Sequence, residues 1–178
     1  MVPLSDGAGE VAALGDGVTR VKIGDRIAGC FHPRWFGGPI KPDYLTDRLG
    51  ANLDGMLAEY AVLSEEAVVP VPQHLAFEEA ASLPCAAVTA WVALTGHRRV
   101  TAGDTAPTQD PLLLTGRRIT LGSISVGSRA DLEAMNRAIA MHRLHPVIDR
   151  TFRFADAKDA YRHFEGRGHF GKVVIAHG

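Results

Sequence analysis

The chain has 178 residues, of which 46% are hydrophobic and 22% are charged, and its formal net charge at pH 7 is −1. This balance, without a long run of Lys or Arg, is typical of a globular protein with one core or one core and a small lobe, and it argues against nucleic acid as a partner. No apolar run reaches the roughly 18 residues of a membrane span and no secretion leader opens the chain, so we expect a cytoplasmic protein without a membrane partner.

The first half of the chain predicts a β-rich lobe over residues 8–72. Short apolar stretches alternate with turn residues, and a tight turn at Gly24-Asp25 precedes a short strand. Residues 30–54 contain three prolines and three glycines and predict a long surface loop with one helical turn near residues 43–49. Two further short strands are expected within residues 55–72.

The pattern changes at residue 77. Residues 77–94 are rich in alanine with apolar residues at helical spacing, which predicts a helix that is interrupted or begins again at Pro84. From residue 119 the pattern predicts a small α/β unit that runs to residue 176 and contains two helices. The strands of this unit are expected to pair with each other.

The α/β unit can be followed element by element. A strand is expected over residues 118–125, and an amphipathic helix follows with Ser128 as its N-cap and Asp131 three residues later. A second strand, a second helix and a final strand then follow. In the second helix Asp156 is expected to cap the start and Gly166 to close the end, and one face carries Ala157, Ala160, Tyr161 and Phe164.

Cysteine and histidine usage predicts no metal site and no disulfide. Cys30 and Cys85 lie far apart without a paired spacing, so both are expected to be reduced, buried thiols. His142 and His145 are three residues apart, but their basic surroundings at a helix end favour solvated side chains over a metal site.

Four stretches together resemble one known family. "DGAGEVAALGDGVTRVKIGDRIAG", "GMLAEYAVLSEEAVVPVP", "EEAASLPCAAVTAWVAL" and "HFGKVVI" resemble a medium-chain dehydrogenase/reductase of the zinc-independent alcohol dehydrogenase and quinone oxidoreductase type, in that family's order. The resemblance implies an α/β fold, α+β overall. Residues 1–76 would form a partial GroES-like substrate domain, and residues 77–178 a hinge helix and a truncated Rossmann-like remnant.

The resemblance breaks at one internal junction. Family members continue from a motif like Gly103-Asp104-Thr105 into a strand, a glycine-rich turn and a helix that hold the cofactor pyrophosphate. Here only residues 106–112 follow before the sequence resembles the family's closing region, and a βαβ unit needs roughly 30 residues. We therefore expect the Rossmann core to be deleted near residues 105–112, the cofactor-binding glycine motif to be absent, and the first strands of the substrate domain to be missing.

The resemblance implies a function and an alternative. The family function is NAD(P)-dependent oxidation or reduction of a small molecule such as an alcohol, aldehyde, enone or quinone, with the cofactor supplying the reactive chemistry. The alternative is a non-catalytic remnant that serves as a binding or dimerisation module. Unpaired strand edges and an uncovered helix face favour a homodimer or another self-associated form.

The resemblance also implies cofactor contacts, each with a structural alternative. Thr89 would lie beside the nicotinamide, or it bonds back to its own helical turn. Val126 and Gly127 would meet the carboxamide at a strand end, or they simply precede the cap at Ser128. Lys172 would approach the cofactor phosphates, or it is an ordinary lysine on an edge strand.

Substrate and metal contacts follow in the same way. Phe31 and Trp35 in the long loop would form a hydrophobic substrate wall, or they pack within the loop. Leu4-Ser5-Asp6 stands where zinc-dependent relatives carry Gly-His-Glu, so the resemblance implies no metal.

Overall fold

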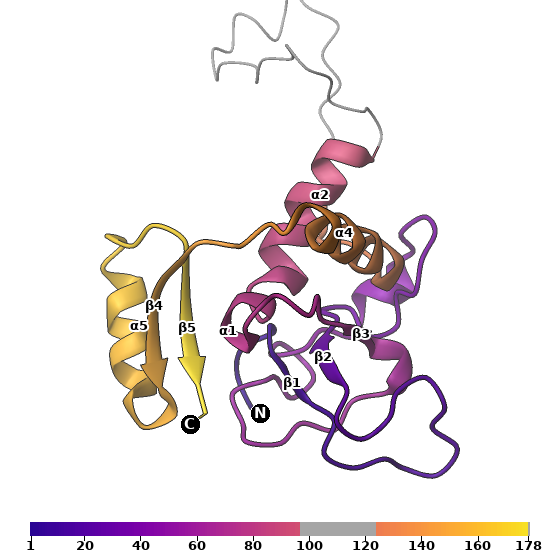
Figure 1. Cartoon of the computed structure of the whole chain (residues 1–178), viewed down its shortest axis with the longest axis horizontal. Coiled ribbons are helices and arrows are strands. Elements are labelled where there is room, and N and C mark those ends of the chain that lie inside the picture. Colours follow the sequence, from indigo (N-terminus) through magenta and orange to yellow (C-terminus); the bar gives the residue numbers. More distant parts are fainter. Residues whose placement is uncertain (97–123, 178) are drawn as a thin grey trace, which may run out of the picture.

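The computed structural model describes residues 1–96 and 124–177 (Figure 1). The junction at residues 105–112 and most of the strand expected at residues 118–125 lie outside the described residues. Ile124 and Ser125 are described and are not part of a strand. Within the described residues, no helix combines the length and the hydropathy needed to cross a membrane.

Three short strands form an antiparallel sheet in the N-terminal lobe, in the order β1-β2-β3. They are β1 (Ala8–Glu10), β2 (Arg26–Gly29) and β3 (Val68–Pro70). The predicted turn before β2 is confirmed, since Gly24 has a φ of +87°, a backbone conformation that favours glycine. The short helical turn expected in the long loop is also present, at Pro42–Leu45.

One of the two strands expected within residues 55–72 does not form, so this prediction was wrong. Residues 56–63 form no strand, and β3 is the one strand within residues 55–72. The backbone amides of Gly55, Met56 and Leu57 bond instead to carbonyls of residues 2–4, and the side chains of Tyr60 and Val62 are exposed. Hydrogen bonds to the start of the chain therefore replace the strand pairing that the alternating pattern predicted.

The helical segment after the sheet is divided at Pro84, as expected. A short α1 (Phe77–Ala80) leads into a π-helical turn (Leu83–Ala87), and α2 (Val88–Thr95) follows directly. Proline has no backbone N–H and its ring crowds the preceding turn, which accounts for a widened turn at this position. Leu83, Pro84 and Val88 are buried there.

The C-terminal part contains the two predicted helices and a parallel strand pair. The elements are α4 (Arg129–His142), β4 (Ile148–Arg153), α5 (Ala157–Glu165) and β5 (Lys172–Ala176). β4 and β5 pair with each other in parallel, which confirms the expected pairing. Ser128 caps α4, because its hydroxyl accepts a hydrogen bond from the Asp131 amide while the Asp131 carboxylate accepts one from the Ser128 amide.

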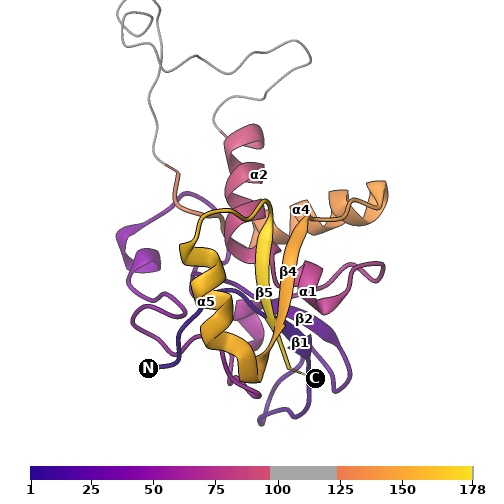
Figure 2. The ribbon, with the colours of Figure 1, turned by 90° about the vertical axis from the view of Figure 1, so that its left-hand side faces the viewer.

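Two details of this part differ from the prediction. The Asp156 side chain makes no capping bond to α5 and instead pairs with Arg153 at 2.8 Å, while Tyr161 and Phe164 on the expected apolar face remain 45% and 59% exposed. In addition, α4 packs mainly on β3 and α2, so the two predicted helices do not belong to one unit (Figures 1 and 2). α5 packs on both β4 and β5, and α1 makes a smaller contact with each strand.

The core lies where α4 meets the N-terminal lobe. It joins side chains from β3, the segment after it, both helices around Pro84, and α4: Val69, Leu75, Ala80, Leu83, Val88, Leu132, Met135 and Ile139. The Asn136 amide of α4 donates to the Pro70 carbonyl at 3.0 Å, which fixes the helix against β3.

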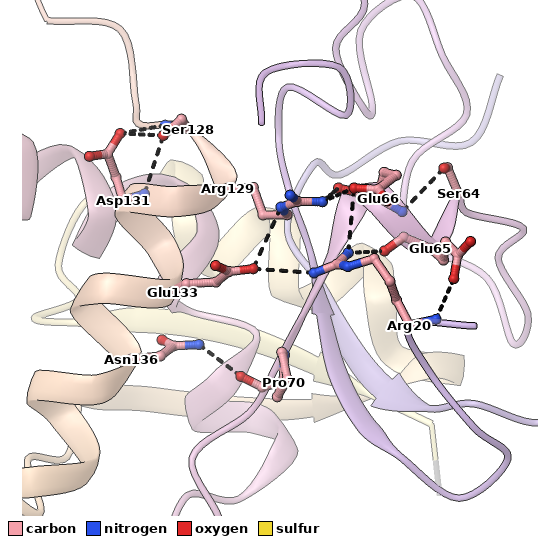
Figure 3. Close-up of polar contacts among 10 residues, drawn as sticks. All are labelled: Arg20, Ser64, Glu65, Glu66, Pro70, Ser128, Arg129, Asp131, Glu133 and Asn136. Atoms are coloured by element: carbon pink, nitrogen blue, oxygen red, sulfur yellow. Dashed lines mark hydrogen bonds and ion pairs between the residues drawn. The ribbon is translucent and has the colours of Figure 1, made fainter. Parts of the chain in front are cut away.

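A charged cluster reinforces the same contact (Figure 3). The Arg20 guanidinium lies 3.3 Å from Glu133 and 3.8 Å from Glu66, and Arg129 pairs with both carboxylates. Arg20 also donates to the Glu65 carbonyl. Two arginines from different segments thus share two glutamates across the joint between α4 and the lobe.

We predict that Gly127→Ala destabilises the protein. A Cβ at Gly127 would lie 2.7 Å from Cγ2 of Val88 and 3.0 Å from Cγ2 of Val92, so α2 would have to move away from the start of α4. Overpacking of this kind costs about 1–3 kcal/mol in the free energy of unfolding, which urea denaturation measures. Gly168→Ala is the matched control, because a Cβ there meets no atom within 4 Å. Equal stabilities of the two variants would contradict the packing described.

Candidate functional site

An open cleft of about 1000 Å³ lies between the N-terminal lobe and β5. Its walls come from β1 and the turn before it, from residues 56–63, from the start of α1, and from α5 and β5. Most of the wall is apolar. Its apolar side chains include Val11, Val21, Ile27, Met56, Leu63, Phe77, Tyr161, Phe164, Val173 and Ile175.

Two oppositely charged side chains meet near the starts of β1 and β5. The Nζ atom of Lys172 lies 3.9 Å from a carboxylate oxygen of Asp6, and the Ser5 hydroxyl donates to the other oxygen at 2.8 Å. Burial raises the pKa of Asp6, and the Ser5 bond and the Lys172 charge offset this only in part. Both side chains line the cleft.

The same carboxylate connects to the helical segment around Pro84. The Cys85 backbone amide also lowers the pKa of Asp6, less than the Ser5 bond and the Lys172 charge do. Burial raises the pKa of the Cys85 thiol, and the Asp6 charge raises it further. The Thr89 hydroxyl in turn donates to the Cys85 carbonyl at 2.6 Å. Lys172 is thus paired with Asp6, Thr89 is bonded to Cys85, and the charge of Asp6 acts on Cys85, and we call these four residues the Lys172–Thr89 chain.

Sequence reasoning missed two of these four residues. Asp6 and Cys85 are 79 positions apart, by their numbers, and no spacing links either of them to Lys172. Only the fold brings the three together. Thr89 and Lys172 were expected at a common site, and each contacts a residue that the sequence analysis had not assigned to that site.

The other expected cofactor contacts have local structural roles. Val126 is buried and has a φ of +50°, and Gly127 gives α2 its close approach to α4. Neither residue, nor Thr89, lines the cleft.

The expected substrate wall packs within the long loop. Trp35 is only 6% exposed, its indole donates to the Gly38 carbonyl at 3.1 Å, and its ring stacks on Tyr44. Phe31 packs against the core and against the edge of the His32 ring. Burial lowers the pKa of His32. The cleft does not reach Phe31 or Trp35, so a substrate role for them stays a prediction.

Comparison with protein families decides the ancestry of the chain. A zinc-binding dehydrogenase family model matches residues 86–175, half of the chain, and an alcohol dehydrogenase GroES-like domain model matches residues 1–73. The chain belongs to the medium-chain dehydrogenase/reductase family. This family consists of NAD(P)-dependent oxidoreductases of the alcohol dehydrogenase and quinone oxidoreductase type.

Individual relatives agree with this assignment. Dehydrogenase pigH of Monascus ruber is 32% identical over 98% of this chain and 48% of its own length. A zinc-type alcohol dehydrogenase-like protein of Schizosaccharomyces pombe is 42% identical over 55% of this chain and 28% of its own length. The chain thus spans about half, or less, of the curated relatives it matches.

Solved structures share the fold. A chain from Sinorhizobium meliloti 1021 described as an alcohol dehydrogenase superposes with a TM-score of 0.80 at 25% identity, covering 98% of this chain and 81% of that one. The cobalt- and zinc-bound alcohol dehydrogenase of Pyrobaculum aerophilum superposes with a TM-score of 0.73 at 21% identity, covering 98% and 82%.

Zinc is the metal that the family description implies, and the donor set at the cleft does not fit it. A protein zinc site takes three or four Cys, His or carboxylate ligands. The donors that line the cleft are carboxylates and one histidine: Asp6, Glu10, Glu59, Glu65, Glu78 and His177. No group of three or more such side chains in the described residues is arranged to hold a metal ion.

The dinucleotide does not fit the described residues either. The spacing G-x-G-x-x-G does occur, at Gly166, Gly168 and Gly171, so the expectation that this motif is absent was wrong for the bare spacing. However, these glycines follow α5 and precede β5, whereas the cofactor fingerprint follows a strand and opens a helix. No helix N-terminus therefore stands behind this turn to hold a pyrophosphate.

We predict that Asp6→Asn stabilises the protein at neutral pH. The pKa of Asp6 is raised in the folded chain, so the protonated carboxyl favours the folded state. This contribution to the unfolding free energy is fully present below the ordinary pKa of 3.8 and is lost as the pH rises through the raised pKa. The asparagine variant avoids this loss. Urea denaturation should therefore give it the higher unfolding free energy at about pH 7 and a similar one at about pH 3.

Asp16→Asn is the control for this experiment, because Asp16 is fully on the surface of the lobe. At about pH 7 its unfolding free energy should be close to that of the parent chain. A variant at Asp6 that loses stability at neutral pH would show that the Lys172 pair outweighs the burial of the carboxylate.

We predict that the purified protein contains no stoichiometric zinc, because the side chains at the cleft do not supply a tetrahedral ligand set. Elemental analysis of the protein after dialysis is the measurement. A value of about one zinc per chain that only strong chelation removes would contradict the prediction.

Proposed function

We propose that this chain is a non-catalytic relative of the NAD(P)-dependent oxidoreductases that works as a binding module. The observation that carries the proposal is the Lys172–Thr89 chain. The ammonium group of Lys172 is already paired with Asp6, and the Thr89 hydroxyl is already bonded to Cys85. The two residues best suited to contact a cofactor thus have partners within the protein.

The sequence supports the same conclusion. Residues 106–112 are too few for the strand, glycine-rich turn and helix that hold a pyrophosphate, and the one G-x-G-x-x-G spacing lies in the wrong order of elements. A dinucleotide gains much of its orientation from that turn. Lys172, Thr89 and Val126 cannot replace its backbone donors and helix dipole.

The second candidate is a working oxidoreductase, and the relatives favour it. They include the quinone oxidoreductase of Pseudomonas aeruginosa and the trans-enoyl reductase tazE of Aspergillus terreus. In this case the cofactor would supply the hydride, and the substrate would be an alcohol, aldehyde, enone or quinone. Lys172 would then have to leave Asp6 to meet a phosphate.

We further propose a cytoplasmic protein that self-associates. The apolar side chains of Leu94 on α2, Met141 on α4 and Leu144 just after α4 are at least half exposed. Apolar surface of this kind favours association with a second copy.

We predict no saturable NADPH binding tighter than about millimolar, which corresponds to about 4 kcal/mol of association free energy. Titration of NADPH fluorescence with the pure protein is the test, and NADPH oxidation with a quinone or an aldehyde should stay at the background rate. Micromolar binding that weakens on Lys172→Ala, but not on Lys158→Ala, would establish the second candidate instead. Lys158 is the matched control because it is exposed on α5 and does not line the cleft.

A further inference from the structure

A serine and a buried histidine meet between the long loop and the segment that precedes α4. The Oγ atom of Ser125 lies 3.5 Å from Nε2 of His32, at the outer limit of a hydrogen bond, although the two residues are 93 positions apart. Ser125 is half-buried, whereas His32 is only 2% exposed. Neither residue lines the cleft, so this pair is separate from the site described above.

The contacts of His32 determine which of its ring nitrogens carries the proton. Nδ1 lies 3.4 Å from the backbone carbonyl oxygen of Asp47. A carbonyl oxygen can only accept, so Nδ1 must donate, and in the neutral ring Nε2 is then left as an acceptor. The Ser125 hydroxyl is therefore the donor in the pair. This is the arrangement of a nucleophile with its base, in which a third group orients the base.

The electrostatics keep His32 in the neutral form that a base requires. Burial lowers the pKa of His32, and the charge of Arg48 lowers it further. Hydrogen bonds to the backbone of Asp47 and Tyr44 act in the opposite direction and offset only part of this effect. Nε2 is therefore free to accept a proton at neutral pH.

The backbone directly after Ser125 is strained. Val126 has a φ of +50°, which a β-branched residue rarely adopts, and such strain is concentrated at functional sites. Within residues 1–96 and 124–177, the amides of Val126 and Gly127 make no hydrogen bond. The amide of the residue after a nucleophile is a usual donor to the oxygen that becomes negatively charged during acyl transfer. The segment thus supplies a donor of the required kind beside the serine.

We propose that Ser125 accepts a short acyl group from an activated ester or thioester, with His32 as its base. This inference goes beyond the proposed function, because it involves neither the cleft nor a cofactor. As Oγ bonds to the acyl carbon, the hydroxyl proton of Ser125 passes to Nε2 of His32. The bond from the acyl carbon to the leaving oxygen or sulfur then breaks, and the proton leaves with the alcohol or thiol.

The surroundings of the pair restrict the reaction to short acyl groups and to a single transfer. The rings of Phe31 and Trp35 meet the His32 ring edge to face, at centroid distances of 4.5 and 6.2 Å, and leave little space beside the base. Because His32 is so little exposed, an acyl group on Ser125 also hinders water from reaching Nε2. We therefore expect slow release by water, so that the transfer is a stoichiometric modification of the chain.

The test uses the full chain and p-nitrophenyl acetate. Release of p-nitrophenolate should show a burst equal in amount to the protein, and mass spectrometry of its peptides should place the acetyl group on Ser125. The burst rate should rise with pH through a pKa below the ordinary 6.5 of histidine, because only the neutral His32 ring accepts the proton. This profile tests the base without any substitution.

Variants identify the two groups. Ser125→Ala should abolish the burst. His32→Gln keeps an amide donor for the Asp47 carbonyl but has no base, so it should slow the burst by at least about a hundredfold. Ser64→Ala and His142→Gln are the matched controls, because both residues are exposed, and they should leave the burst unchanged. Thermal unfolding of each variant checks that it is folded.

Several results would overturn the proposal. Acetylation confined to lysines or the N-terminus, a burst that His32→Gln leaves unchanged, or a burst rate that does not depend on pH would each do so. Sustained turnover that is lost in Ser125→Ala would overturn the single transfer and identify an esterase. NADPH titrated in parallel separates the two proposals: micromolar NADPH binding removes the binding-module function, whereas absence of acetylation at Ser125 removes only this site.

Discussion

The contact between α4 and the N-terminal lobe is the constraint on which the rest of the structure depends. α4 comes late in the chain, yet its buried side chains Leu132, Met135 and Ile139 complete the core formed by Val69 and Val88. Full burial of such a side chain contributes about 1.5–3 kcal/mol, so this one interface supplies much of the driving force for folding. The two arginines and two glutamates at its margin add orientation more than free energy, because these pairs are partly exposed.

Because α4 belongs to the lobe, the β4–α5–β5 segment is left with few neighbours. α5 and, to a smaller extent, α1 contact its two strands, and Tyr161 and Phe164, which line the cleft, stay about half exposed. The pair of Asp6 and Lys172 is the polar link between this segment and the lobe. The cleft exists because the lobe sheet and the β4–β5 pair face each other without sharing a ladder.

The ancestry of the chain and the contacts of its expected site residues are separate observations. Its segments match the substrate domain and the dehydrogenase domain of a known oxidoreductase family, and its fold superposes on alcohol dehydrogenases. The residues that the resemblance places beside a cofactor also make contacts within the protein. Gly127 gives room to α2, Thr89 closes a helical turn, and Lys172 balances a buried carboxylate. Function depends on such residues and not on the fold that carries them.

The sequence by itself determined the local elements and the ancestry. The cap at Ser128, the break at Pro84, the turn at Gly24 and the strand–helix–strand order at the C-terminus could be predicted because each depends on neighbouring residues. Periodicity failed at residues 56–63, where pairing with the start of the chain prevailed.

Only the tertiary structure decided which segments meet. An amphipathic pattern shows that α4 has an apolar face, but it does not show which surface covers that face. In the structure the N-terminal lobe and α2 cover it, and the β4–β5 pair does not. The meeting of Asp6, Cys85 and Lys172, and that of His32 and Ser125, likewise depend on contacts between distant residues. Such contacts have no signature in a single sequence, because burial and charge pairing are properties of the packed chain.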